Sequence, residues 1–158
     1  MNLFLIRHAK TEKQSISGKD FDRKLAEKGK NQARILNDFI ASFDFQAVDI
    51  WCSDAERTKQ TIAAIDSNFP SENIEFKKEL YLASLNEINQ LIWNSESDQD
   101  LLIIGHNEGL SELASYYAGE NIHLKTATFL QITFNADTRK EWSQDLGSIK
   151  TLFRPEIE

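Results

Sequence analysis

The chain has 158 residues, of which 41% are hydrophobic and 27% are charged. This length and composition predict one domain, residues 1–158, with a core of ordinary size. The formal net charge of −7, with no lysine- and arginine-rich block, argues against nucleic acid or an anionic membrane as a partner. One cysteine excludes an intramolecular disulfide, and no apolar run approaches the ~18 residues of a membrane span. We therefore expect a cytoplasmic protein, in which an anionic ligand would need a local cationic pocket.

The first third of the chain alternates short apolar runs with longer polar or amphipathic segments. Residues 3–6 are apolar on both alternating faces, which predicts a short buried strand. Residues 11–22 are polar and predict a loop. Apolar side chains at helical spacing predict a helix within residues 25–43, and the apolar run at 47–52 predicts a second strand.

The middle of the chain continues this alternation. Asp54 is expected to cap a helix that runs through Arg57 to Ile65. Residues 74–76 predict a weak strand, and residues 84–93 place apolar side chains at helical spacing.

The last third contains the clearest strand and then changes character. Residues 100–105 (DLLIIG) predict a buried strand, and Asn107 is expected to cap the helix that follows it. Alternating residues within 128–134 and 142–153 predict two or three antiparallel edge strands. The whole pattern predicts an α/β fold, a three-layer α/β/α sandwich with a mostly parallel central sheet and antiparallel C-terminal edge strands.

Three of the predicted strands are followed by arginine or histidine. Arg7 and His8 end the first strand, Arg57 lies one turn into the helix after the second, and His106 directly follows residues 100–105. Because the carboxyl ends of parallel strands meet at one edge of a sheet, these four side chains are expected in one pocket. Taken singly, each has a structural explanation, such as a surface ion pair for Arg57. Their placement at matching junctions favours a shared function.

A pocket of two arginines and two histidines suits a phosphoryl group. Guanidinium groups can bind its oxygens in pairs, and a neutral imidazole is a competent nucleophile toward phosphorus. A second imidazole, protonated, can donate to an oxygen as charge rearranges in the transition state. This chemistry requires no metal ion and no other cofactor.

Four stretches in this order, LIRHAKT, RKLAEKG, SDAERTKQT and IIGHNEG, resemble the histidine phosphatase superfamily, which has the phosphoglycerate-mutase-like fold. The short length and the RKLAEKG segment look most like its SixA-type branch, the phosphohistidine phosphatases. The resemblance implies that His8 is the nucleophile and that Arg7 and Arg57 clamp the phosphate. It also implies that His106 is the second pocket histidine and that Thr11 lines the pocket mouth.

Two residues depart from the family's commonest first motif. Ala9 stands where glycine is usual, and Lys10 stands where mutase-type members often have an acidic residue. Many members also use a carboxylic acid to protonate the leaving oxygen, and this chain has no clear equivalent. Glu79 is the nearest candidate, although a solvated surface charge is its simpler interpretation.

The missing acid suits a phosphoramidate, because the P–N bond to an imidazole breaks with less help than a phosphate ester. We therefore expect a phosphatase that acts on phosphohistidine presented by a protein. Two alternatives stay open, a general small-molecule phosphomonoesterase of the same superfamily and a module that binds a phosphorylated ligand without turnover. A metal site built on His8, His106 and a carboxylate is disfavoured, because the two arginines would repel the cation.

Overall fold

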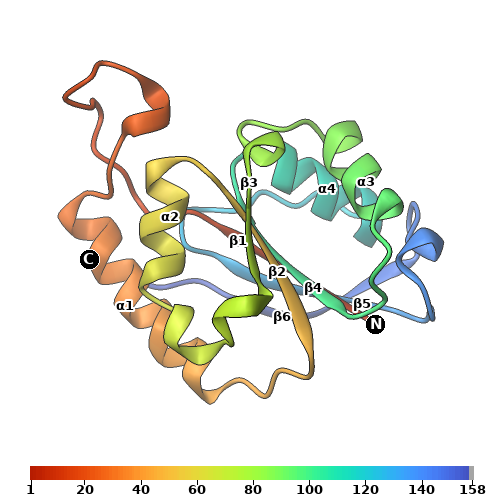
Figure 1. Ribbon diagram of the computed structural model, residues 1–158. Coiled ribbons are helices and arrows are strands. Elements are labelled where there is room, and N and C mark those ends of the chain that lie inside the picture. The colour runs from red at the N-terminus through yellow and green to blue at the C-terminus, as the bar shows by residue number, and fades with distance from the viewer. Residues whose placement is uncertain (157–158) are drawn as a thin grey trace.

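A mixed sheet runs through the centre of the molecule (Figure 1). The computed structural model describes residues 1–156. Within them the sheet has six strands in the order β3-β2-β4-β1-β5-β6. The strands are β1 (Asn2–Arg7), β2 (Val48–Ser53), β3 (Ile74–Lys77), β4 (Asp100–Gly105), β5 (Phe129–Phe134) and β6 (Gly147–Phe153). Strands β1 to β4 are parallel, whereas β5 pairs antiparallel with β1 and β6 pairs antiparallel with β5. The predicted mostly parallel sheet with antiparallel C-terminal strands is confirmed, and of those two strands only β6 lies at the edge.

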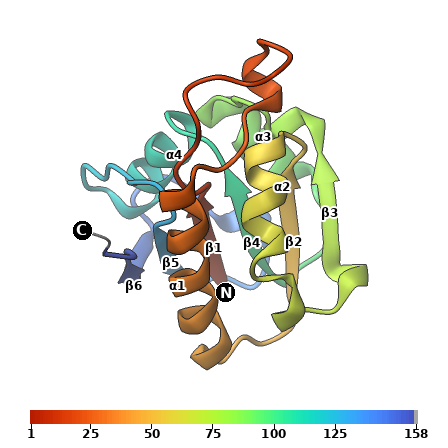
Figure 2. The same ribbon diagram turned by 90° about the vertical axis from the view of Figure 1, so that its left-hand side faces the viewer.

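Helices cover both faces of this sheet. They are α1 (Glu27–Ser42), α2 (Glu56–Ala63), α3 (Leu85–Asn94) and α4 (Gly109–Ala118). In Figure 2, α1 and α2 lie in front of the strands, and α3 and α4 lie on the opposite face. This is the predicted three-layer sandwich. None of the helices within residues 1–156 is long and apolar enough to cross a bilayer.

Two apolar cores hold the layers together, and the alternation along β1 shows how. Phe4 and Ile6 pack under α1 and α2, whereas Leu3 and Leu5 pack under α3 and α4. All four are almost completely buried. Fully burying such a side chain contributes about 1.5–3 kcal/mol, so β1, with only six residues, is anchored firmly from both sides.

The residues that cap the helix N-termini agree only in part with those expected from the sequence. The α3 helix begins after Ser84, whose side chain forms a capping box with Glu87. The predictions that Asp54 and Asn107 cap the helices after the functional motifs were wrong. Asp54 forms an ion pair with Lys59 at 3.0 Å, and the Asn107 amide donates to the carbonyl of Leu124 at 2.8 Å. The acceptor oxygens that would cap the helices are thus engaged elsewhere: Lys59 pairs with the Asp54 carboxylate, and the Ser111 hydroxyl donates to Asn107 Oδ1 at 2.7 Å.

Close packing behind the first strand fixes the path of the chain after His8. Gly29 of α1 lies against the backbone of Lys10, where a Cβ would stand 1.9 Å from the Lys10 carbonyl oxygen. The same carbonyl accepts a hydrogen bond from the Ala26 amide at 3.0 Å. The RKLAEKG segment thus holds the turn that follows His8 in place.

Candidate active site

The carboxyl ends of β1, β2 and β4 meet beside a pocket of about 310 Å³. The structure brings together around it all five residues predicted for the phosphate site, namely Arg7, His8, Thr11, Arg57 and His106. The two imidazole rings lie 5.3 Å apart, centroid to centroid. Glu79 does not line this pocket; it is exposed beside a separate hollow along α3.

His8 is held in one tautomer by the backbone. Its Nδ1 lies 2.8 Å from the carbonyl oxygen of Ala9, which can only accept, so Nδ1 carries the proton. Its Nε2 makes no hydrogen bond within residues 1–156 and keeps its lone pair. Burial lowers the pKa of His8 to about 4, and the charges of Arg57 and Arg7 add to this effect. The ring is therefore neutral at pH 7, as a nucleophile requires.

Ala9 is accommodated without backbone strain. It is not among the residues with positive φ, its side chain is fully buried, and its amide donates to Thr61 Oγ1 at 3.1 Å. Alanine therefore serves where the commonest motif has glycine.

Arg7 and Arg57 approach the pocket from two elements. Arg7 donates from Nη1 to the carbonyl of Leu124 at 2.9 Å. Arg57, only 3% exposed, donates from Nη1 and Nη2 to the carbonyl and carboxylate of Asp20, at 2.7 and 3.0 Å. Within residues 1–156, the Nε of each arginine is buried without a hydrogen-bond partner. Two anchored guanidinium groups thus keep donors free for an anion.

Asp20 connects the loop of residues 12–24 to this site. Its carboxylate also accepts from the Tyr81 hydroxyl at 2.6 Å and pairs with Arg23 Nε at 3.3 Å. Burial acts to raise the pKa of Asp20, but the hydrogen bonds from Tyr81 and Arg57 outweigh it and the pKa lies below its usual value. Asp20 is therefore an anchor for Arg57 and stays a carboxylate at neutral pH.

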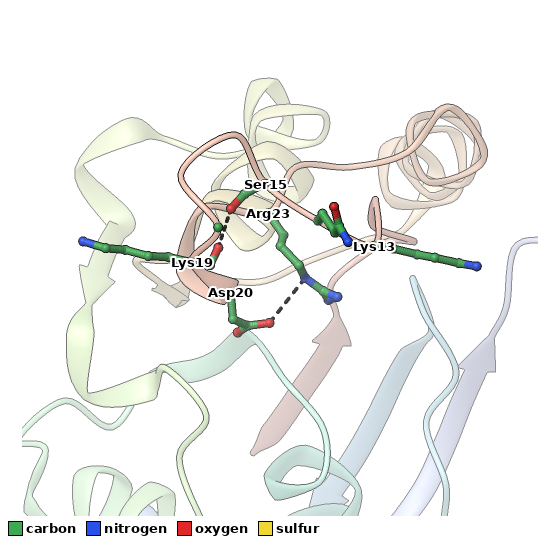
Figure 3. Close-up of a pocket in the computed structure, with 7 residues that line it drawn as sticks. Lys13, Ser15, Lys19, Asp20 and Arg23 are labelled. Carbon is green, nitrogen blue, oxygen red and sulfur yellow. Dashed lines mark hydrogen bonds and ion pairs between the residues drawn. The ribbon is translucent and has the colours of Figure 1, made fainter.

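Figure 3 shows the hollow that adjoins the site under the same loop, with Asp20 and Arg23 pointing toward each other. This hollow, of about 400 Å³, shares Arg23 and Lys13 with the first pocket. Lys13 and Lys19 extend away from it on either side. The first pocket is lined by Lys10, Lys13 and Arg23 against the one carboxylate of Glu12, so its mouth is cationic in a chain whose formal charge is −7.

His106 differs from the sequence-based expectation in its charge. Burial lowers its pKa to about 3, and the charges of Arg57 and Arg7 act in the same direction. The second imidazole is therefore neutral in this site, where a protonated ring was expected. Its Nε2 lies 2.7 Å from Ser53 Oγ, and its Nδ1 is buried without a partner within the described chain. A neutral ring can still donate through one N–H.

Four residues of this arrangement were missed by sequence reasoning, namely Asp20, Arg23, Ser53 and Tyr81. Arg23 and Ser53 lie within the stretches RKLAEKG and SDAERTKQT, so these motifs could have identified them. Asp20 and Tyr81 are far apart in sequence, and only the folded loop brings them to Arg57.

The arrangement can bind and polarise a tetrahedral anion. Two buried donor atoms, Arg7 Nε and Arg57 Nε, and the buried Nδ1 of His106 have no partner within residues 1–156, and unsatisfied buried polar atoms are costly unless a ligand pairs with them. Beside them lies an imidazole whose lone pair is available. Within the same residues, His, Cys, Asp and Glu side chains form no group of three that could hold a metal ion.

Comparison with known proteins agrees with this geometry. The histidine phosphatase superfamily (branch 1) profile matches residues 3–101. An uncharacterized chloroplastic protein of Arabidopsis thaliana is 31% identical over 147 residues, which cover 85% of this chain and 67% of that protein. Identity at this level over most of both chains supports common descent.

Solved structures share the fold. A candidate phosphohistidine phosphatase SixA from Agrobacterium tumefaciens superposes with a TM-score of 0.82 at 24% identity, covering 98% of this chain and 97% of that one. A protein histidine phosphatase SixA complexed with tungstate gives a TM-score of 0.81 at 17% identity, with the same coverage. From the profile match and the sequence relative, the chain belongs to the histidine phosphatase superfamily.

Proposed function

We propose that this protein hydrolyses phosphohistidine on a protein, through a covalent phosphohistidine intermediate on His8 and without a metal ion. The observation that carries the proposal is His8 itself. Its Nδ1 proton is held by the Ala9 carbonyl, and its Nε2 lone pair lies in a pocket with two buried guanidinium donors that have no partner within residues 1–156. The tungstate complex of a SixA protein with the same fold supports an oxyanion as the ligand.

In the first step, Nε2 of His8 attacks phosphorus while the P–N bond of the substrate breaks. Arg7 and Arg57 bind the phosphoryl oxygens, and His106 donates to one of them as charge shifts. The substrate imidazole enters protonated on its other nitrogen. It therefore takes the bonding electron pair and leaves as a neutral ring, so no acid is needed at the broken bond.

In the second step, water attacks the phosphoryl group on His8. The P–Nε2 electron pair returns to the ring, and a water proton goes to solvent as inorganic phosphate forms. The Ala9 carbonyl keeps the Nδ1 proton in place throughout. Phosphorylated His8 is thereby a cationic ring, which is a good leaving group.

A phosphoramidate fits this site better than an ester. An alkoxide leaving group would forgo the ~10²–10⁴-fold that general acid catalysis supplies. Asp20 remains ionised, and Glu79 lies beside another hollow. Between α2 and β4 the described chain contains only short turns, β3 and α3, and no long inserted segment that could cover the site. An open site suits a phosphohistidine presented on a protein surface.

The test is phosphate release from a phosphohistidine-bearing protein in EDTA, with p-nitrophenyl phosphate as a second substrate. His8→Ala should abolish turnover and leave the fold intact. The matched control is His123→Ala, because His123 is exposed and outside the pocket. Comparable turnover of both substrates would support a general phosphomonoesterase. Binding without turnover of either would support the non-catalytic alternative, and loss of activity in EDTA would contradict the metal-free mechanism.

A further inference from the structure

Ser53 touches His106 at the end of β2, and sequence reasoning assigned it no role. Its side chain is fully buried, and its Oγ lies 2.7 Å from His106 Nε2. That contact is the only hydrogen bond of Ser53 Oγ within residues 1–156. Its carbonyl accepts from Thr58 Oγ1 at 2.7 Å, so the strand end is fixed to α2.

The distance alone does not say which atom donates, but the hydrogen-bond count does. If Ser53 donates to Nε2, its own proton is satisfied, and His106 carries its proton on Nδ1. If Nε2 donates instead, the buried Ser53 proton has no acceptor within the described residues and Nδ1 becomes an unpaired lone pair. With Ser53 as the donor, only the His106 Nδ1–H lacks a partner. With Nε2 as the donor, both the Ser53 hydroxyl proton and the Nδ1 lone pair lack one, and each unpaired buried polar group is unfavourable.

The arginines alone would favour a lone pair on Nδ1, but the anion that they bind favours the same choice as the hydrogen-bond count. Arg57 and Arg7 act on His106 from the pocket, and Asp20 is the one facing carboxylate that opposes them. A neutral ring beside these cations and an incoming anion needs a donor toward the phosphoryl group, and a lone pair there would repel it. We infer that Ser53 is a positioning residue that fixes His106 as the Nδ1–H tautomer, so that Nδ1 donates to the transferring phosphoryl group.

This inference refines the proposed phosphoryl-transfer site and so rests on the proposed function. It predicts two histidines with the same tautomer for different purposes. His8 holds its Nδ1 proton on a carbonyl to free Nε2, whereas Ser53 occupies Nε2 of His106 to free Nδ1–H. Free imidazole side chains prefer the opposite tautomer, so removing the hydroxyl should release His106.

The experiment combines ¹⁵N NMR of the histidine rings with kinetics. The chain has three histidines, so the spectrum is simple and can be assigned with single substitutions. In wild type, His106 should show a protonated Nδ1 and an unprotonated, hydrogen-bonded Nε2. In Ser53→Ala, the protonated signal should move toward Nε2, and kcat should fall about 10- to 100-fold, the loss of one hydrogen bond to a charged group.

Two further variants separate positioning from packing. Ser53→Thr keeps the hydroxyl and should restore the wild-type tautomer and most of kcat. Thr58→Val removes a buried hydroxyl from the same turn without touching His106, so it should lower stability and leave the His106 tautomer unchanged.

The inference is overturned if wild-type His106 is protonated on Nε2, or if Ser53→Ala changes neither the ring signals nor kcat. The ring signals need no substrate. The predicted tautomer in a protein that fails to turn over phosphohistidine would therefore refute the proposed function and leave the role of Ser53 in fixing the tautomer supported.

Discussion

Replacing Arg57 with lysine tests the phosphate clamp while keeping its charge. The wild-type guanidinium is 3% exposed, donates from Nη1 and Nη2 to Asp20, and keeps a buried Nε donor without a partner within residues 1–156. A lysine offers one ammonium in place of this fork. It cannot hold Asp20 and donate to a phosphoryl oxygen in the same geometry.

The size of the effect follows from the hydrogen bonds that the lysine cannot make. A hydrogen bond to a charged group contributes about 1.5–3 kcal/mol, and the substitution removes one from the phosphoryl group. The ion pair with the Asp20 carboxylate adds less, since that side chain is 47% exposed. A total of about 2–4 kcal/mol corresponds to a loss of about 30- to 1,000-fold in kcat/KM.

The assay is phosphate release from the phosphohistidine protein, with thermal unfolding to show that the variant folds. Arg34→Lys, an exposed change of the same chemistry on α1, is the matched control and should behave as wild type. A loss in Arg57→Lys of less than about threefold, under 1 kcal/mol, would refute the fork geometry.

Four further outcomes are expected: one for the pH dependence of activity, two for stability, and one for the activity of a Glu79 variant. Because burial and the neighbouring arginines lower the pKa of His8 to about 4, kcat/KM should not fall as the pH drops from 7 and should decline only near about 4; a decline with a half-maximum near about 6.5, the ordinary histidine value, would contradict this. The unfolded chain binds protons on His8 and His106 at that higher pH, so chemical denaturation should show the free energy of unfolding decreasing as the pH falls from about 6.5. Gly29→Ala would force a methyl group onto the Lys10 carbonyl and should destabilise the protein by about 1–3 kcal/mol, seen as a lower Tm; an unchanged Tm would show that α1 does not press on that turn. Glu79→Gln should leave kcat/KM within about twofold of wild type, as for a surface change, and a larger loss would make Glu79 the missing acid.

The fold could be predicted from the sequence, and so could the proximity of four site residues, Arg7, His8, Arg57 and His106. Both follow from general rules for strands in parallel sheets. The run at residues 100–105 is apolar on both faces, and such a strand must lie in the middle of a covered parallel sheet. Once β1, β2 and β4 are parallel, the residues after them share an edge. Arg7, Arg57 and His106 therefore meet whatever the details of the loops.

The remaining interactions depend on those details. Asp20 was expected in a polar loop, but it begins a 3-10 turn, Asp20–Asp22, and its pairing with Arg57 depends on how the surrounding segment folds back. Asp54 and Asn107 have good capping side chains, yet Lys59 and the Ser111 hydroxyl occupy their acceptor oxygens. The expectation that His106 is protonated was wrong, because burial beside two arginines lowers its pKa. The sequence does not reveal this burial.

The most direct test of the account is to trap the phosphorylated enzyme. Wild-type protein is mixed with ³²P-phosphohistidine protein, quenched in alkali within the first turnover and digested for peptide mapping. The account predicts an acid-labile, alkali-stable label on His8, with phosphorus bonded to Nε2, that is absent from His8→Ala and present in His123→Ala. Rapid phosphate release with no label at any time, or a label on another residue, would contradict it.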